Sequence, residues 1–337
     1  MKIQEIPLFA IQGFKAGHAE DKEAGTGVSV FLFDRLSPVG ADIRGGGPAS
    51  RETPLLDPQK GANGLHALVL SGGSAFGLDA GGGVLNYLEE RGIGFDVGVT
   101  KVPLVCQSCL FDLTVGSATV RPGREMAYQA CKNAANTAFL EGCIGAGMGA
   151  SVGKVLGMDY AMKTGIGAYA LELDGIQAGA VVVLNALGDI FDPETGQKIA
   201  GILASDKKSF SSDRTAQLEL LKLLAQEQNL FTQSQEEQKQ HSVINTTLGI
   251  IFTNAKFDKA QLSKLASVTH NAYARTISPV HTMADGDTVY AVSLGEKKAD
   301  INALGVLCTM VMEKAIVRAV KTAEPLFGLP SYLSLFK

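Results

Sequence analysis

The chain has 337 residues, of which 46% are hydrophobic and 19% charged, and this composition excludes disordered and fibrous proteins. The net charge is −4 with both signs interspersed, and no lysine–arginine cluster could follow a phosphate backbone, so nucleic acid is not an expected partner. Five cysteines, an odd number, argue against a disulfide framework. The first residues form no signal peptide, and no apolar run reaches about 18–20 residues. We therefore expect a cytoplasmic protein that needs no membrane.

The first half of the chain predicts strands, one clear helix and glycine-rich turns. A strand at 28–34 follows a Gly-Thr-Gly turn, and the near-continuous apolar run at 65–70 is typical of a strand covered on both faces. A helix is expected from 75 to 91, with Gly92 as its C-cap and Ser74 as its N-cap. Two strands, 167–173 and 178–184, flank Asp174-Gly175, which is a hairpin signal.

The second half changes character at a polar segment. An amphipathic helix is expected at 215–226, and the glutamine-rich stretch 226–240 is typical of a solvated linker. A strand at 246–253, a helix at 259–276, a strand at 288–294 and a helix at 302–322 follow. Helices around strands, without steady βαβ alternation, indicate a layered α/β sandwich.

Two glycine-rich segments imitate nucleotide sites. The segment from Gly149 to Lys154 resembles a phosphate loop, but it is one residue short and Val155 replaces the hydroxyl residue that would hold magnesium. The segment Gly145–Gly149 lacks the dinucleotide-binding spacing. A nucleotide-binding module therefore stays an alternative that measurable affinity for ATP or NAD would favour.

Other chemically suggestive residues have ordinary explanations. Ser74 stands at a strand-to-helix turn, but Phe76 replaces the second glycine of a nucleophile elbow. Cys106 and Cys109 have CxxC spacing without a second pair, so two buried thiols are expected. For the dispersed histidines, packing or surface roles are the default; these are His18, His66, His241, His270 and His281.

The junction Asn245-Thr246 combines three features: the polar linker ends, a buried strand begins, and its first residue carries a hydroxyl. A threonine hydroxyl is a poor nucleophile until a base removes its proton. Cleavage of the Asn245–Thr246 bond would create an α-amine beside that hydroxyl, and its reference pKa of about 7.7–8.0 suits a base near neutral pH. A plain strand start is the alternative explanation.

Eight segments extend the argument over nearly the whole chain. They are Arg44–Pro48 with Arg51–Thr53, Leu70–Asp79, Phe111–Leu113, Gly145–Lys154, Val183–Asn185 with Gly188, Asn245–Thr247, Thr253–Ala255, and Pro279–Thr282 with Asp285–Thr288. Together and in this order, they resemble the autoprocessing aminopeptidase family. That family includes the L-aminopeptidase/D-amidases, the β-peptidyl aminopeptidases and the nylon-oligomer hydrolases.

The resemblance implies roles for individual residues. It places the nucleophile on Thr246, which opens the smaller fragment after self-cleavage, and an acidic pair on Asp285 and Asp287. It matches Asn185 to an asparagine near the nucleophile, whose amide could stabilise the oxyanion, and Lys154 to a lysine that stabilises the oxyanion or pairs with an aspartate. Threonine with two aspartates is more similar to the nylon-oligomer hydrolases than to the serine aminopeptidases, and Phe111 stands where some members carry a tyrosine.

The resemblance also implies the architecture and the reaction. We expect a single domain, a four-layer αββα sandwich of the N-terminal-nucleophile-hydrolase type, cleaved into 1–245 and 246–337. It should hydrolyse small peptides or amides through an acyl-enzyme on Thr246, without metal or cofactor, as a homo-oligomer, often a tetramer. An endo-acting ω-amino-acid oligomer hydrolase, an acyltransferase similar to the ornithine acetyltransferases, and a non-catalytic scaffold are the alternatives.

Overall fold

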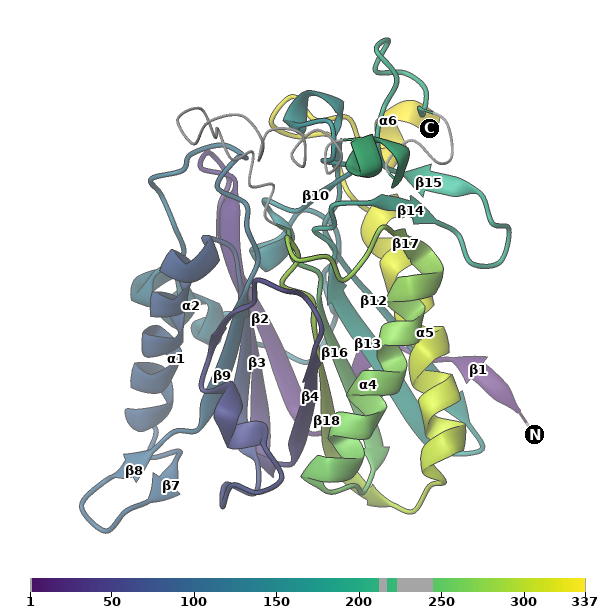
Figure 1. Cartoon of the computed structure of the whole chain (residues 1–337). Coiled ribbons are helices and arrows are strands. Elements are labelled where there is room, and N and C mark those ends of the chain that lie inside the picture. Colours follow the sequence, from purple (N-terminus) through teal and green to yellow (C-terminus); the bar gives the residue numbers. More distant parts are fainter. Residues whose placement is uncertain (1, 212–216, 223–244, 337) are drawn as a thin grey trace, which may run out of the picture.

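The computed structural model describes residues 2–211, 217–222 and 245–336. Two sheets lie face to face, and helices cover their outer faces (Figure 1). The order of layers is helices α1 (Ala80–Glu89) and α2 (Arg124–Lys132), the smaller five-stranded sheet, the larger six-stranded sheet, then helices α4 (Lys259–Thr276) and α5 (Ile301–Lys321). This is the expected four-layer αββα sandwich.

The two sheets differ in size. The larger sheet has the strand order β1 (Ile3–Glu5), β12 (Ile166–Leu173), β13 (Ile176–Val183), β16 (Leu248–Ala255), β18 (Thr288–Lys297), β4 (Val39–Ile43). The smaller sheet has the order β2 (Phe14–Asp21), β3 (Thr26–Ser37), β6 (Leu65–Ser71), β9 (Val105–Cys109), β5 (Ala49–Arg51). Only β16–β18 and β6–β9 pair in parallel in these two sheets, among the described residues.

Shorter strands and helices decorate this frame. Two small sheets have two strands each: β7 (Phe95–Asp96) with β8 (Lys101–Val102), and β10 (Ser151–Val152) with β11 (Met162–Lys163). A third small sheet has the strand order β15 (Lys198–Ala200), β14 (Asp189–Phe191), β17 (Ile277–Ser278). The α-helices are α1 (Ala80–Glu89), α2 (Arg124–Lys132), α4 (Lys259–Thr276), α5 (Ile301–Lys321) and α6 (Tyr332–Phe336).

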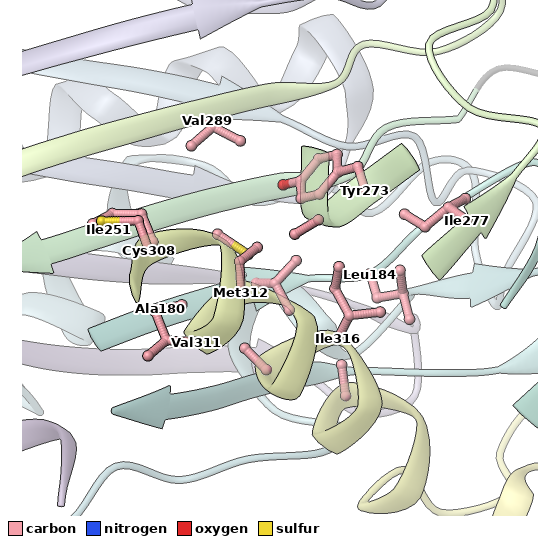
Figure 2. Packing of buried hydrophobic residues seen from close by; sticks show 14 of the residues in the cluster. Ala180, Leu184, Ile251, Tyr273, Ile277, Val289, Cys308, Val311, Met312 and Ile316 are labelled. Carbon is pink, nitrogen blue, oxygen red and sulfur yellow. The ribbon is translucent and has the colours of Figure 1, made fainter. Parts of the chain in front are cut away.

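Three apolar clusters hold the layers together, as expected when every face between layers is buried. Between the sheets, Phe14 and Phe252 stack with ring centroids 4.1 Å apart. Under α4 and α5, side chains such as Met312 and Ile316 of α5 pack on residues of the larger sheet such as Ile251 (Figure 2). Under α1 and α2 lies a third cluster of small and β-branched residues.

The periodic segments were predicted well, and their local chemistry explains why. Helix α4 has the predicted bounds because Asp258 and Gln261 form a reciprocal capping box at its start. The β12–β13 hairpin turns at Asp174 and Gly175, whose φ angles of 46° and 86° suit a primed turn. The strands at 28–34, 65–70, 246–253 and 288–294 and the helix at 302–322 are also found, with boundaries shifted by a few residues.

The helix predicted from 75 to 91, with Ser74 as its N-cap, was wrong at its start. Ser74–Asp79 is a 3-10 helix, and α1 begins only at Ala80. Ser74 is not an N-cap: the cap residue is Gly73, and Ser74 itself has a left-handed φ of 53°. Of the helix predicted at 215–226, residues 217–222 are helical. Its other residues and the linker predicted at 226–240 lie outside the described residues.

Candidate active site

The site forms where the parallel pair β16–β18 begins. Asn245 lies beside Asp285 in a parallel bridge, and the Asn245 N–H donates to the Ala284 carbonyl at 2.8 Å. The Gly286 N–H donates to the Asn245 carbonyl at 2.8 Å, and the Thr288 N–H donates to the Thr247 carbonyl at 3.1 Å. This ladder fixes the Asn245–Thr246 peptide against the Asp285–Thr288 segment.

Thr246 is enclosed, with 2% of its surface exposed. Its Oγ1 donates to the carbonyl of Asn245 at 2.5 Å, and its N–H donates to the backbone carbonyl of Asn185 at 2.9 Å. A Cβ at Gly286 would lie 2.5 Å from Thr246 Oγ1, which is too close for any side chain. Glycine at 286 therefore makes room for the hydroxyl and also supplies an N–H to the same carbonyl.

Asn185 connects this peptide to Lys154. Its Oδ1 accepts from Lys154 Nζ at 2.7 Å and from the Ser151 N–H at 3.1 Å, and its Nδ2 donates to the Phe111 carbonyl at 2.9 Å. Asn185 therefore faces Thr246 with its backbone carbonyl, and its side chain orients the lysine. The Lys154 N–H donates to the Leu187 carbonyl at 2.9 Å, which anchors the glycine-rich segment to the strand end that carries Asn185.

Burial sets the charge of the lysine. Desolvation lowers the pKa of Lys154 to about 7, although the carboxylates of Asp285 and Asp112 act in the opposite direction. A neighbouring ammonium, Lys163, lowers it further. An amine with this pKa can hold or release a proton near neutral pH.

The two aspartates have different surroundings. Asp287 uses both oxygens: Oδ1 accepts from the Thr247 N–H at 2.8 Å, and Oδ2 from His281 Nδ1 at 2.8 Å. Asp285 Oδ2 accepts hydrogen bonds from the N–H and the hydroxyl of Thr282, both at 2.7 Å. Asp285 Oδ1 has no hydrogen-bond partner among the described residues. Burial and the nearby Asp287 charge raise the pKa of Asp285 to about 6.

The six residues singled out in the sequence thus lie in one region. Their contacts differ from the expectation at Asn185: its side-chain amide, expected near the oxyanion, donates to the Phe111 carbonyl. Asp287 accepts from the N–H of Thr247, the residue after the nucleophile. Two residues were missed. His281 was assigned no more than a packing or surface role, but it hydrogen-bonds Asp287. Asp112 is buried near Lys154 and accepts from the Thr26 hydroxyl and the Gly73 N–H, both at 2.7 Å. Both belong to segments already quoted for the family resemblance, which was the available signal.

Several other features lie outside the site. Cys106 and Cys109 are the expected buried free thiols, and burial raises the pKa of Cys109 to about 12, so neither is a reactive nucleophile. His241 lies outside the described residues. In the described ranges, no group of three or more His, Cys, Asp or Glu side chains could hold a metal ion. No helix in those ranges is long and apolar enough to span a bilayer.

The sequence and the fold are similar to those of known proteins. Residues 8–331 match peptidase family S58. An uncharacterized aminopeptidase of Mycobacterium tuberculosis is 33% identical over 97% of this chain and 96% of the relative. A 6-aminohexanoate-oligomer endohydrolase of Kocuria sp. is 30% identical over 94% of this chain and 87% of the relative. The L-aminopeptidase D-Ala-esterase/amidase of Ochrobactrum anthropi, described as a variant of the Ntn hydrolase fold, superimposes with a TM-score of 0.70 at 15% identity, covering 98% of this chain and 90% of that one.

Proposed function

The chain belongs to peptidase family S58, and on that premise we propose that it is a self-cleaving amide hydrolase with Thr246 as its nucleophile. As an aminopeptidase of the Ntn hydrolase fold, it acts on amide bonds of peptides or similar small molecules. One observation carries the finer proposal. The Thr246 hydroxyl and the Gly286 N–H both contact the carbonyl oxygen of Asn245, the residue before the nucleophile.

That contact supports self-cleavage as the first reaction. Thr246 Oγ1 adds to the carbonyl carbon of Asn245, and the Gly286 N–H stabilises the oxyanion that forms on the carbonyl oxygen. The Thr246 nitrogen takes up the hydroxyl proton and leaves as an amine, so the amide becomes an ester. Water then hydrolyses the ester, releasing Asn245 as a new carboxyl terminus and leaving Thr246 with a free α-amine.

The same groups serve the hydrolysis of external amides. The new α-amine can accept the proton of Thr246 Oγ1, because both belong to one residue. The Asn185 carbonyl, which accepts from the Thr246 N–H at 2.9 Å, keeps the amine in place. A substrate carbonyl replaces that of Asn245 beside the Gly286 N–H, so the oxyanion donor is reused. The Asn245 side is fully buried before cleavage, so its release gives substrate a route to the nucleophile.

Lys154 and Asp285 supply the electrostatics. With a pKa of about 7, Lys154 carries substantial positive charge at neutral pH, and that charge favours the oxyanion. Asn185 Oδ1 holds the ammonium at 2.7 Å, which limits its motion. Asp285, with a pKa of about 6, is mostly ionised at neutral pH and stabilises the Lys154 ammonium.

We further propose that the enzyme removes an amino-terminal residue or cuts a small aminoacyl amide. An exopeptidase must bind the ammonium group of its substrate. Asp285 Oδ1 has no hydrogen-bond partner in the described ranges, whereas both oxygens of Asp287 are occupied. Asp285 is therefore the carboxylate available for that ammonium, since the Asn185 carbonyl already accepts from the Thr246 nitrogen.

Self-cleavage is tested by the intact mass of the purified protein. We expect two pieces covering 1–245 and 246–337, and amino-terminal sequencing of the smaller piece should begin Thr-Thr-Leu-Gly-Ile. Thr246→Ala should stay full length and inactive, and Thr246→Ser should still cleave. A wild-type chain that remains intact while it hydrolyses amides would overturn the mechanism, and normal cleavage of the alanine variant would move the nucleophile to another residue, with Thr247 examined first.

Substrate selection is tested separately on the cleaved enzyme. The kcat/KM for an alanine or β-alanine p-nitroanilide is compared with that for the same compound acetylated on its amino group. We expect acetylation to lower kcat/KM strongly in wild type, and much less in Asp285→Asn, because the carboxylate is gone. Equal values for the two compounds in wild type would show that the ammonium is not recognised and would favour an endo-acting oligomer hydrolase.

A further inference from the structure

His281 is placed to fix the position of Asp287. Its Nδ1 lies 2.8 Å from Asp287 Oδ2, and its backbone N–H donates to the same oxygen at 3.2 Å. Asp287 Oδ1 in turn accepts from the N–H of Thr247, the residue after the nucleophile. The carboxylate is thus clamped between His281 on one side and the nucleophile strand on the other.

The donor in this clamp is determined by chemistry. An ionised carboxylate only accepts hydrogen bonds, so Nδ1 of His281 must carry the proton in the His281–Asp287 contact. The backbone of His281 has a left-handed φ of 57°, a conformation that non-glycine residues seldom adopt. This backbone conformation lets the N–H and the Nδ1 of His281 both reach Asp287 Oδ2.

Behind His281, several buried polar side chains lie close together on the helix side of the larger sheet. His281 lies against His270 and Tyr273 of α4, with ring centroids 4.8 Å and 6.0 Å away. His281 Nε2, His270 Nδ1, Tyr273 Oη and Thr247 Oγ1 are all buried without a hydrogen-bond partner in the described part of the chain. Most buried polar atoms in native proteins are hydrogen-bonded, so a group of such atoms calls for an explanation. Their gathering beside Asp287 separates this region from ordinary core.

His270 does not compete for the carboxylate. Its Nε2 contacts the Asp42 carbonyl at 3.0 Å, and burial lowers the pKa of His270 to about 4, so the ring is neutral. Asp42 and Arg44, the nearby charged groups on and after β4, act on His270. Of the two rings, His281 is therefore the one that hydrogen-bonds Asp287.

We propose that His281 is a positioning residue: its Nδ1–H holds the Asp287 carboxylate, which holds the Thr247 backbone and so the Thr246 hydroxyl at the reacting carbonyl. The inference rests on the proposed role of Thr246. It adds a residue that touches neither substrate nor nucleophile and acts through Asp287. A small displacement of a reacting group lowers turnover steeply, because the nucleophile must approach the carbonyl carbon along a narrow range of directions.

The left-handed backbone at 281 allows a sharp set of variants. His281→Gly removes the side chain and keeps the φ angle without strain. His281→Asn also tolerates a left-handed φ, and its amide places an N–H donor on the same atom position as Nδ1. His66→Asn is the matched control: His66 lies on β6 in the other sheet and accepts from the Leu104 N–H at 2.9 Å.

The experiment measures kcat and KM of the cleaved enzymes, with folding checked by circular dichroism. His281→Gly should lower kcat on the order of 10- to 100-fold with KM little changed, because substrate contacts are intact. His281→Asn should restore most of kcat, and His66→Asn should equal wild type. A glycine variant that stays uncleaved while the asparagine variant cleaves also supports the proposal, because self-cleavage uses the same hydroxyl. If the glycine variant loses its fold, the imidazole N–H resonance of wild type described below carries the test.

Three results would overturn the inference or its premise, and they differ. Wild-type kcat in His281→Gly, with Asp287→Ala inactive, would refute the role of His281 alone. Equal losses in folded His281→Gly and His281→Asn would show that the hydrogen-bond donor is not what matters. An active, self-cleaved Thr246→Ala variant would instead refute the proposed function. In wild type, a far-downfield imidazole N–H resonance that disappears in both Asp287→Ala and His281→Asn would identify the hydrogen bond directly.

Discussion

At the scale of single residues, the site depends on the backbone of one glycine, Gly286, as well as on charged side chains. Gly286 donates its N–H to the Asn245 carbonyl at 2.8 Å, and its missing Cβ leaves the space that Thr246 Oγ1 occupies. Backbone donors of this kind are fixed by the strand and need no reorganisation when charge develops. The side chains of Lys154 and Asp285 then set the charge around a geometry that the backbone has already fixed.

Gly286→Ala should therefore prevent self-cleavage. The new Cβ would lie 2.5 Å from Thr246 Oγ1 and force the hydroxyl from the Asn245 carbonyl. We expect a full-length chain on a denaturing gel and a loss of amidase activity on the order of 10²-fold or more. Gly61→Ala is the matched control, since a Cβ there meets nothing within 4 Å. Normal cleavage of the Gly286→Ala chain would mean that this hydroxyl position is not the reacting one.

The rate of self-cleavage should be bell-shaped in pH. Asp285 has a raised pKa of about 6, so it loses its charge as the pH falls below that value. Lys154 has a lowered pKa of about 7, so it loses its proton as the pH rises above it. The charged pair is most populated between these values, and the newly formed α-amine cannot contribute before the bond is cut. The measurement is the rate at which freshly translated chains cleave themselves at each pH. We expect the Lys154→Met profile to lack the alkaline limb and the Asp285→Asn profile to lack the acidic limb. Profiles with both limbs unchanged would show that neither group controls the reaction.

At the scale of elements, the sequence predicted the helices and strands that have a regular apolar periodicity, but not the local turns and contacts that lack one. Helix α4 and strands β6, β16 and β18 were found because their apolar periodicity continues over many residues. The first turn of the 75–91 helix was wrong, because Gly73 and Ser74 take left-handed backbone that no periodicity encodes. The contact between α4 and β16 at Gly249 could not be predicted from periodicity either. Only the fold brings the Tyr273 phenol over that glycine.

Gly249→Ala should destabilise this helix–sheet contact. An added Cβ would lie 2.6 Å from Tyr273 Oη and 2.7 Å from Met312 Cε. Overpacking of this kind typically costs about 1–3 kcal/mol in the free energy of unfolding. Tyr273→Phe removes the hydroxyl, so the double variant should lose less stability than Gly249→Ala loses alone. Urea unfolding of the four proteins in this cycle measures the coupling, and strictly additive changes would show that the two residues do not press on each other.

At the scale of the whole molecule, the layers followed from the pattern of elements and from family resemblance, but the site network did not. Thr246, Lys154, Asn185, Asp285 and Asp287 could be proposed because each stands in a segment that resembles the family. His281 could not be assigned a function because its partner lies six residues on, across a turn that brings its ring back onto Asp287. The roles of the two aspartates were likewise not separable from sequence, since only the hydrogen bonds show that Asp287 is fully occupied and Asp285 is not.

The order of strands makes a last prediction about the cleaved protein. Cleavage at Asn245–Thr246 would leave β16 and β18 on the smaller fragment, and in the larger sheet they lie side by side between β13 and β4 of the larger fragment (Figure 1). Helices α4 and α5 of the smaller fragment also cover that sheet. Separation would expose this core and break two strand ladders, so we expect both fragments to elute together from a native sizing column and to separate only in denaturant. A smaller fragment that elutes alone without denaturant would contradict this strand order.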